Sequence, residues 1–125
     1  MQKQLIIPEG TDVKKMVIAP AVRAGDFLYL SGTAGAKGGK LAGPDIESQA
    51  RQALENLGEV LKAAGSSFDK VVKVNCFLTY PMRDFAGWNK VFKEFFPNNP
   101  PARTTVGAPI AMEGAIIEVE LIALT

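Results

Sequence analysis

The chain has 125 residues, a formal net charge of +1, no histidine and one cysteine, and its length predicts a single domain over residues 1–125. The missing histidines exclude Ser-His-Asp and Cys-His catalytic groups and histidine-bearing metal sites, so we expect no metal, no cofactor and a chemistry of carboxylates, arginine, hydroxyls, backbone groups and water. The near-neutral charge supplies no large basic field for nucleic-acid backbones.

The N-terminal third of the chain predicts a β-hairpin followed by a loop. Two short β-like runs, residues 17–22 and 27–30, flank a turn signal at residues 24–26. The segment 32–43 then holds five glycines and two lysines. This composition predicts a mobile surface loop within the domain.

The middle of the chain predicts a helix and a strand. Asp45 is suited to cap a helix that Gly65 ends, because apolar residues between them recur at spacings of three and four. Residues 71–80 alternate, and Pro81 ends that run. One face of this strand is predicted to point into the core with Val72, Val74, Cys76 and Leu78.

The C-terminal part predicts a second helix and two strands. The helix is expected from about Asp84, because four aromatic residues form a stripe at spacings of three and four that we interpret as core. Strands are predicted at 102–106 and 115–124. The stripe consists of Phe85, Trp88, Phe92 and Phe95, and the core face of the last strand of Ile117, Val119, Leu121 and Ala123.

This order of elements predicts an α+β domain with a mixed sheet and both helices packed on one face. The other face of the sheet would stay apolar and exposed in a single chain. We therefore expect a homo-oligomer, with a site shared between subunits.

Three charged residues are candidates for chemistry. Arg103 follows two prolines and opens a strand, which suits a forked contact with a carboxylate or phosphate; an ordinary salt bridge is the alternative. Glu118 and Glu120 lie two apart in an apolar strand and leave by the same face. Burying a carboxylate there costs free energy unless donors meet it, so either at least one is functional or both reach solvent or a basic partner.

Weaker candidates are polar residues at element ends. Ser31 and Gly32 close the run 27–30, where a hydroxyl and a backbone N–H can meet a ligand; a simple turn is the alternative. Asn89 lies in the aromatic helix and is suited to a ligand or to capping backbone groups. Cys76 alternates inward, which favours an inert buried thiol over a nucleophile.

Several segments together resemble the Rid (YjgF-type) family of enamine/imine deaminases, which older descriptions call endoribonuclease L-PSP or translation inhibitors. The resemblance implies a chorismate-mutase-like fold and a homotrimer around a central barrel, with sites between subunits. It also implies hydrolysis of 2-aminoacrylate-type enamines and 2-imino acids to 2-keto acids and ammonia. The segments are 22–32, 49–65, 71–77, 84–96 and Pro101-Ala102-Arg103 with Ile117-Glu118-Val119-Glu120.

The resemblance also implies roles for single residues. Arg103 occupies the position of a carboxylate-binding arginine and Glu118 that of an acidic residue near the attacking water. Ser31, Gly32 and Asn89 match pocket positions, and backbone groups at Thr105 are expected to hold the imine nitrogen or water. Two positions depart from the pattern of the family: Ala21 stands where a tyrosine is common, and Thr105 where a cysteine is common.

Three functions follow, in descending order: an enamine/imine deaminase acting on a small carboxylate-bearing substrate, a non-catalytic carboxylate-binding or regulatory trimer, and a ribonuclease. Ala21 is the best support for the second. The ribonuclease ranks last because the chain has a near-neutral charge and no histidine. No long apolar stretch indicates a membrane segment, and the single cysteine fits a reducing compartment, so we expect a cytoplasmic protein.

Overall fold

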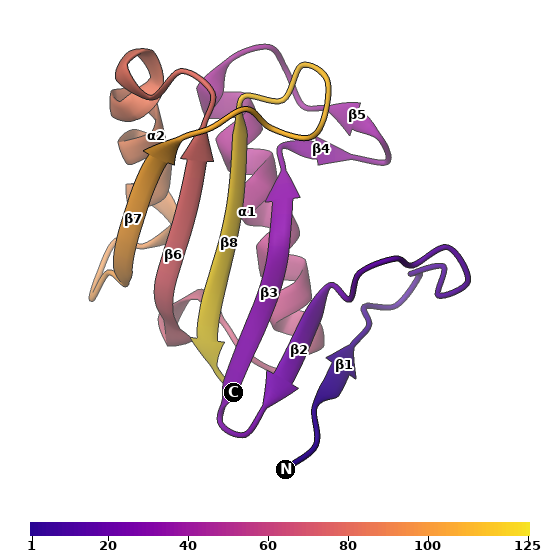
Figure 1. Ribbon diagram of the computed structural model, residues 1–125. Helices are drawn as coiled ribbons and strands as arrows, with labels where there is room; N and C mark the ends of the chain where they lie inside the picture. The colour runs from indigo at the N-terminus through magenta and orange to yellow at the C-terminus, as the bar shows by residue number, and fades with distance from the viewer.

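A six-stranded mixed sheet in the order β1-β2-β3-β8-β6-β7 carries both helices on one face (Figure 1). The structure is a computed structural model that describes residues 1–125. Only β6 and β7 pair in parallel; the other neighbours are antiparallel. The α+β prediction is confirmed. The strands of this sheet are β1 (Gln4–Ile6), β2 (Ala21–Ala24), β3 (Phe27–Ala34), β6 (Val71–Leu78), β7 (Ala102–Gly107) and β8 (Ile117–Leu124).

Helix α1 (Ile46–Ala63) forms where its periodicity predicts it. The Asp45 carboxylate accepts a hydrogen bond from the Ser48 N–H and so satisfies a free donor of the first turn. Gly65 follows the helix with a φ of +77°, a backbone conformation that glycine adopts without strain. The apolar face of α1 packs on the sheet and supplies its largest share of the core, including Leu54, Leu57 and Leu61.

Helix α2 (Pro81–Phe95) begins three residues earlier than predicted. Pro81 stands at the first helical position, where its missing N–H costs nothing because that group has no intrahelical partner. Trp88 and Phe92 are buried as expected, but Phe85 is 45% exposed. The interpretation of the whole aromatic stripe as core was therefore wrong for Phe85. A short 3-10 turn, η1 (Phe68–Lys70), leads into β6.

The N-terminal strands differ from the prediction. Within the run 17–22, only Ala21 and Val22 join a strand, and Val17 and Ile18 are exposed. β2 pairs with β3 on one side and with β1 on the other, and β1 was not predicted from the sequence. The turn at residues 24–26 is confirmed as the two-residue connection between paired Ala24 and Phe27.

The glycine-rich segment 32–43 is more ordered than a loop. Strand β3 continues through Ala34, and a second hairpin of β4 (Ala36–Lys37) and β5 (Lys40–Leu41) follows. Gly38 and Gly39 make its turn with φ of +60° and +77°, which suits the twist of a two-residue hairpin. The prediction of an irregular loop was wrong, because Gly38 and Gly39 serve the turn of a hairpin.

The two faces of the sheet differ in burial. On the helix face the predicted alternation of β8 is confirmed, since its four core residues are all buried. Along β6, Val74, Cys76 and Leu78 are buried, but Val72 is 38% exposed because the register shifts between Val71 and Lys73. The opposite face, here called the outer face, leaves Phe27, Tyr29, Val106 and Leu124 exposed.

No helix in the chain combines the length and the apolar composition needed to cross a membrane.

Candidate functional site

Arg103 lies on the helix face of β7, at the edge of the sheet. It stands in register with buried Val74 of β6, and paired residues of neighbouring strands share a face. Its Nη2 donates to Asn89 Oδ1 over 2.7 Å. The guanidinium carbon also lies 4.8 Å from the ring centre of Phe92, 5.5 Å from that of Phe85 and 5.8 Å from that of Trp88.

These contacts hold the guanidinium without neutralising it. The aromatic faces attract a cation, and the Asn89 amide takes up one N–H. No acidic side chain forms an ion pair with Arg103. The structure therefore excludes the ordinary salt bridge within the chain, and leaves a planar set of donors free for an anion such as a carboxylate.

Thr105 stands two residues after Arg103 on the same face and lines an open groove. The groove has a volume of about 530 Å³, and Pro81, Met82, Phe85 and Ala86 of α2 form the rest of its lining. The Thr105 hydroxyl donates to the Cys76 sulfur over 3.5 Å. Asn89, Arg103 and Thr105 therefore belong to one cluster, here called the arginine cluster.

Cys76 lies in the core beneath this cluster. Burial raises the pKa of its thiol, and the contacts with Thr105, Arg103 and Trp88 only partly offset that effect. A buried, protonated thiol is a poor nucleophile. The geometry therefore agrees with the inert thiol predicted from the alternation of the strand.

Glu118 lies on the outer face of β8, in register with Phe77. A Cβ placed on Gly32 would lie 3.1 Å from Glu118 Oε2, so the glycine allows the carboxylate to lie against the backbone of β3. Glu118 forms no ion pair within the chain. Glu120 differs, since its Oε2 accepts a hydrogen bond of 3.2 Å from the Asn75 amide.

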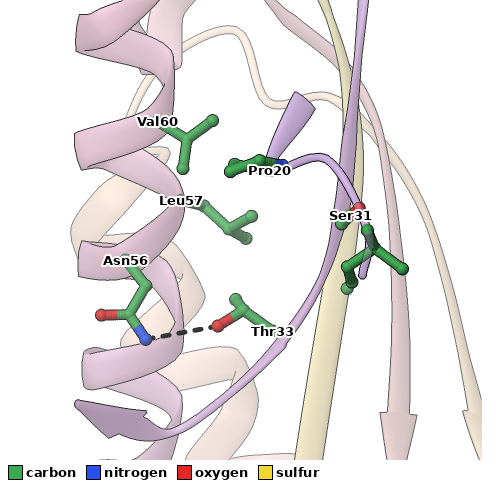
Figure 2. A pocket seen from close by; sticks show the side chains of 8 residues that line it. Pro20, Ser31, Thr33, Asn56, Leu57 and Val60 are labelled. Atoms are coloured by element: carbon green, nitrogen blue, oxygen red, sulfur yellow. Dashed lines mark hydrogen bonds between the residues drawn. The ribbon is translucent and has the colours of Figure 1, made fainter. Parts of the chain in front are cut away.

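Ser31 ties the preceding segment to β3 and stands at the edge of a small pocket. Its hydroxyl donates to the Ala19 carbonyl over 2.6 Å, and its N–H donates to the Pro20 carbonyl over 3.0 Å. Figure 2 shows the pocket between this strand and α1, with Asn56 donating to the Thr33 hydroxyl. Its volume is about 230 Å³, and the lining residues are Ile18, Pro20, Ser31, Gly32, Thr33, Asn56, Leu57 and Val60.

Gly32 and Glu118 form a second group, here called the glutamate cluster. The β-bulge between Leu30 and Thr33 sets its backbone, because it breaks the regular pairing of β3 with β8. Ala21 contributes nothing to a ligand here, since its methyl group is fully buried opposite Leu30.

The two clusters do not meet within one chain. The arginine cluster lies on the helix face at the β7 edge, whereas Glu118 lies on the outer face of β8, with β6 between the two strands (Figure 1). One small ligand cannot contact both carboxylate and guanidinium from opposite sides of a sheet. Asn89, Arg103 and Thr105 therefore lie apart from Gly32 and Glu118, and Ser31 lines the pocket against α1.

Met82 and Phe85 are the residues near the arginine cluster that sequence reasoning missed. The periodicity of α2 assigned Phe85 to the core and ignored Met82, which is 95% exposed. The available signal was the position of both residues in the first turns of a helix that leads to Asn89. Helical spacing of four places Phe85 and Asn89 on one side.

Comparisons with known proteins identify relatives along most of the chain. The family model described as endoribonuclease L-PSP matches residues 17–125. The chain is 48% identical over 106 residues to the mitochondrial protein mmf2 of Schizosaccharomyces pombe, covering 82% of this chain and 83% of that protein. It is 37% identical over 106 residues to a human protein named 2-iminobutanoate/2-iminopropanoate deaminase, covering 83% and 77%.

A solved structure gives the same result for the fold. A Yersinia pestis protein described as a member of the conserved Rid family superposes with a TM-score of 0.85 at 31% identity, covering 99% of this chain and all of that one.

Proposed function

The chain belongs to the endoribonuclease L-PSP family, which includes Rid (YjgF-type) proteins, and from this premise we propose that it hydrolyses a reactive enamine or 2-imino acid to a 2-keto acid and ammonia. The relative named as an imine deaminase supports a reactive-intermediate deaminase at the level of the family. The observation that carries the proposal for this chain is Arg103, a guanidinium held on one side by Asn89 and free of any acidic partner.

In the proposed reaction Arg103 forks onto the substrate carboxylate. Water then adds to the imine carbon, which is already electrophilic, and its proton passes through the Glu118 carboxylate to the nitrogen. The hydroxyl proton of the tetrahedral intermediate then moves to the nitrogen, the C–N bond breaks, and ammonia and the 2-keto acid are released. An enamine first takes a proton on carbon to become the imine. The enzyme has to supply only position and proton transfer, which requires no histidine.

We further propose that each site is completed by a second copy of the chain within a homotrimer. Two observations support this arrangement: the clusters that carry Arg103 and Glu118 lie on opposite faces of one sheet, and the outer face leaves apolar side chains exposed. Light scattering coupled to size-exclusion chromatography should give three times the mass of one chain. A monomeric mass would remove the shared site.

The reaction is tested by diversion of a trapped imine. An amino acid oxidase generates a 2-imino acid in the presence of semicarbazide, and the semicarbazone is followed with rising amounts of the protein. We expect the rate of semicarbazone formation to fall as the imine is hydrolysed. No diversion for any amino acid would favour a carboxylate-binding protein without turnover, the alternative that the buried Ala21 keeps open.

The proposal includes a cytoplasmic location, which the single buried thiol fits. The name of the mmf2 relative says mitochondrial, so fractionation of the cells that make this protein is the measurement that decides.

A further inference from the structure

The groove beside Arg103 has apolar walls and shares a side chain with the arginine cluster. Phe85 lines the groove and also places its ring centre 5.5 Å from the Arg103 guanidinium carbon. Met82, Pro81 and Ala86 supply the remaining apolar lining, and Thr105 is its polar member. An anion held by Arg103 therefore lies next to an apolar surface that nothing in the chain covers, since Met82 is 95% exposed.

We propose that this groove selects the substrate: it binds the side chain of 2-imino acids that carry an extended, uncharged apolar group. Met82 and Phe85 are then the specificity-determining residues. The inference rests on the proposed deaminase function, because it uses the carboxylate of the same ligand as the anchor at Arg103. It adds which side chain the ligand carries and where that side chain lies.

The charges around the groove favour an uncharged occupant. The nearest basic residue on α2 is Arg83, and its guanidinium is already paired with the Asp84 carboxylate through two contacts of 2.9 Å. It also stacks on the ring of Tyr80 at 4.2 Å. No lining residue carries a charge. A second carboxylate on the ligand would therefore be desolvated without a partner, which costs free energy.

The size of the preference follows from the burial of methylene groups. Full burial of one methylene raises the affinity about fourfold, and an open groove that covers about half of the methylene raises the affinity about twofold. The 2-imino acid derived from leucine has three more carbons than the one derived from alanine. We therefore expect its kcat/KM to be about eightfold higher, and that of the glutamate-derived imine to be lower than that of the leucine-derived one.

The test compares 2-imino acids generated from alanine, norvaline, leucine and glutamate in the diversion assay. The measured quantity is the ratio of kcat/KM for the leucine-derived imine to that for the alanine-derived imine. In the variant Met82→Ala, one wall of the groove is lost and the ratio should fall at least twofold. Met112→Ala, which removes a methionine outside the lining, is the matched control and should keep the ratio of the parent chain.

The possible outcomes separate the two proposals. Turnover of all four imines with a ratio near one would overturn the groove proposal and leave the deaminase function intact. If no imine is hydrolysed, the function fails, and calorimetry with pyruvate and 4-methyl-2-oxopentanoate then tests the groove alone. Tighter binding of the larger keto acid, lost in Met82→Ala, supports the groove; equal affinity overturns it.

Discussion

Gln49 and Arg103 are both polar side chains in the layer between helices and sheet, yet their hydrogen bonding differs. Gln49 is fully buried, and its amide nitrogen donates to the Gly43 and Gly114 carbonyls over 2.8 and 3.1 Å. Its amide oxygen accepts from the Ile116 N–H over 2.9 Å. Arg103 makes one side-chain hydrogen bond, to Asn89.

This difference separates a structural polar group from one that is ready for a ligand. Every hydrogen-bonding atom of the Gln49 side chain has a partner in the chain. The residue therefore connects the start of α1 to the segment before β8 and has no free donor or acceptor for a ligand. Arg103 is held in place but keeps free donors and an unpaired charge. Changes at the first residue should therefore alter stability, and changes at the second should alter activity.

The largest expected effect is that of Arg103→Ala on turnover. Removal of the carboxylate anchor should lower kcat/KM about 1000-fold, equivalent to about 4 kcal/mol, while thermal unfolding changes little because Arg103 satisfies no buried carboxylate. The imine diversion assay and a thermal melt measure the two quantities. Arg103→Lys is the control, since it keeps the charge and loses the forked pair of donors. Its kcat/KM should lie between that of the parent chain and that of Arg103→Ala. Undiminished turnover in Arg103→Ala would remove its assigned role.

The next effect in size is the loss of stability in Gln49→Leu. The substitution leaves two carbonyls and one N–H without partners in a buried region, which should lower the free energy of unfolding by about 3 kcal/mol. Urea unfolding at one protein concentration measures it. Gln52→Leu, one turn further along α1, is the matched control: that amide bonds only the Asn56 side chain, so its loss should cost less than about 1 kcal/mol. Equal losses in the two variants would contradict the structural role of Gln49.

The fold could be predicted where hydrophobic periodicity is regular. Strand β8 and helix α1 lie where their alternation and spacing place them. The β4–β5 hairpin could not be predicted, because Gly38 and Gly39 carry the same composition signal in a tight turn as in a loop. Val17 and Ile18 have high strand propensity yet stay exposed, since β1 takes the position beside β2.

The candidate site could be predicted in its residues but not in its layout. A hydrogen bond joins Arg103 and Asn89, which the sequence predicts separately as site residues, and their roles stay predictions. The alternation of β8 places Glu118 on the outer face, but the position of Arg103 on the helix face follows only from the pairing of β7 with β6, which no local pattern specifies. The function of Gln49 was equally invisible, because one of its partners is 65 residues away.

A smaller effect is expected when Arg103 is given a partner within the chain that neutralises its charge. In Asn89→Asp a carboxylate replaces the amide that now accepts from Nη2, so it neutralises the guanidinium and competes with the substrate. We expect kcat/KM to fall about 30-fold, equivalent to about 2 kcal/mol, with stability unchanged or higher. Asn98→Asp adds the same charge in the exposed connection after α2 and serves as the control. Full activity in Asn89→Asp would show that the free donors of Arg103 are not what the reaction uses.

The smallest effect concerns Cys76, which lies in the core beneath the arginine cluster. Burial raises the pKa of its thiol, so the folded chain keeps a proton that the unfolded chain releases above about pH 8.5. The unfolded state then binds fewer protons, and the free energy of unfolding decreases as pH rises through that range. The contribution of Cys76 is complete below about pH 8.5 and should decline by less than about 1 kcal/mol by about pH 9. Urea unfolding of the parent chain and of Cys76→Ala between pH 7 and 9.5 isolates the contribution of Cys76, because only the parent should show this decline.

The charge of Arg103 lowers the pKa of the Cys76 thiol, so the decline should extend to higher pH in Arg103→Ala. A pH dependence unaffected by that substitution would place the guanidinium too far from the thiol to act on it.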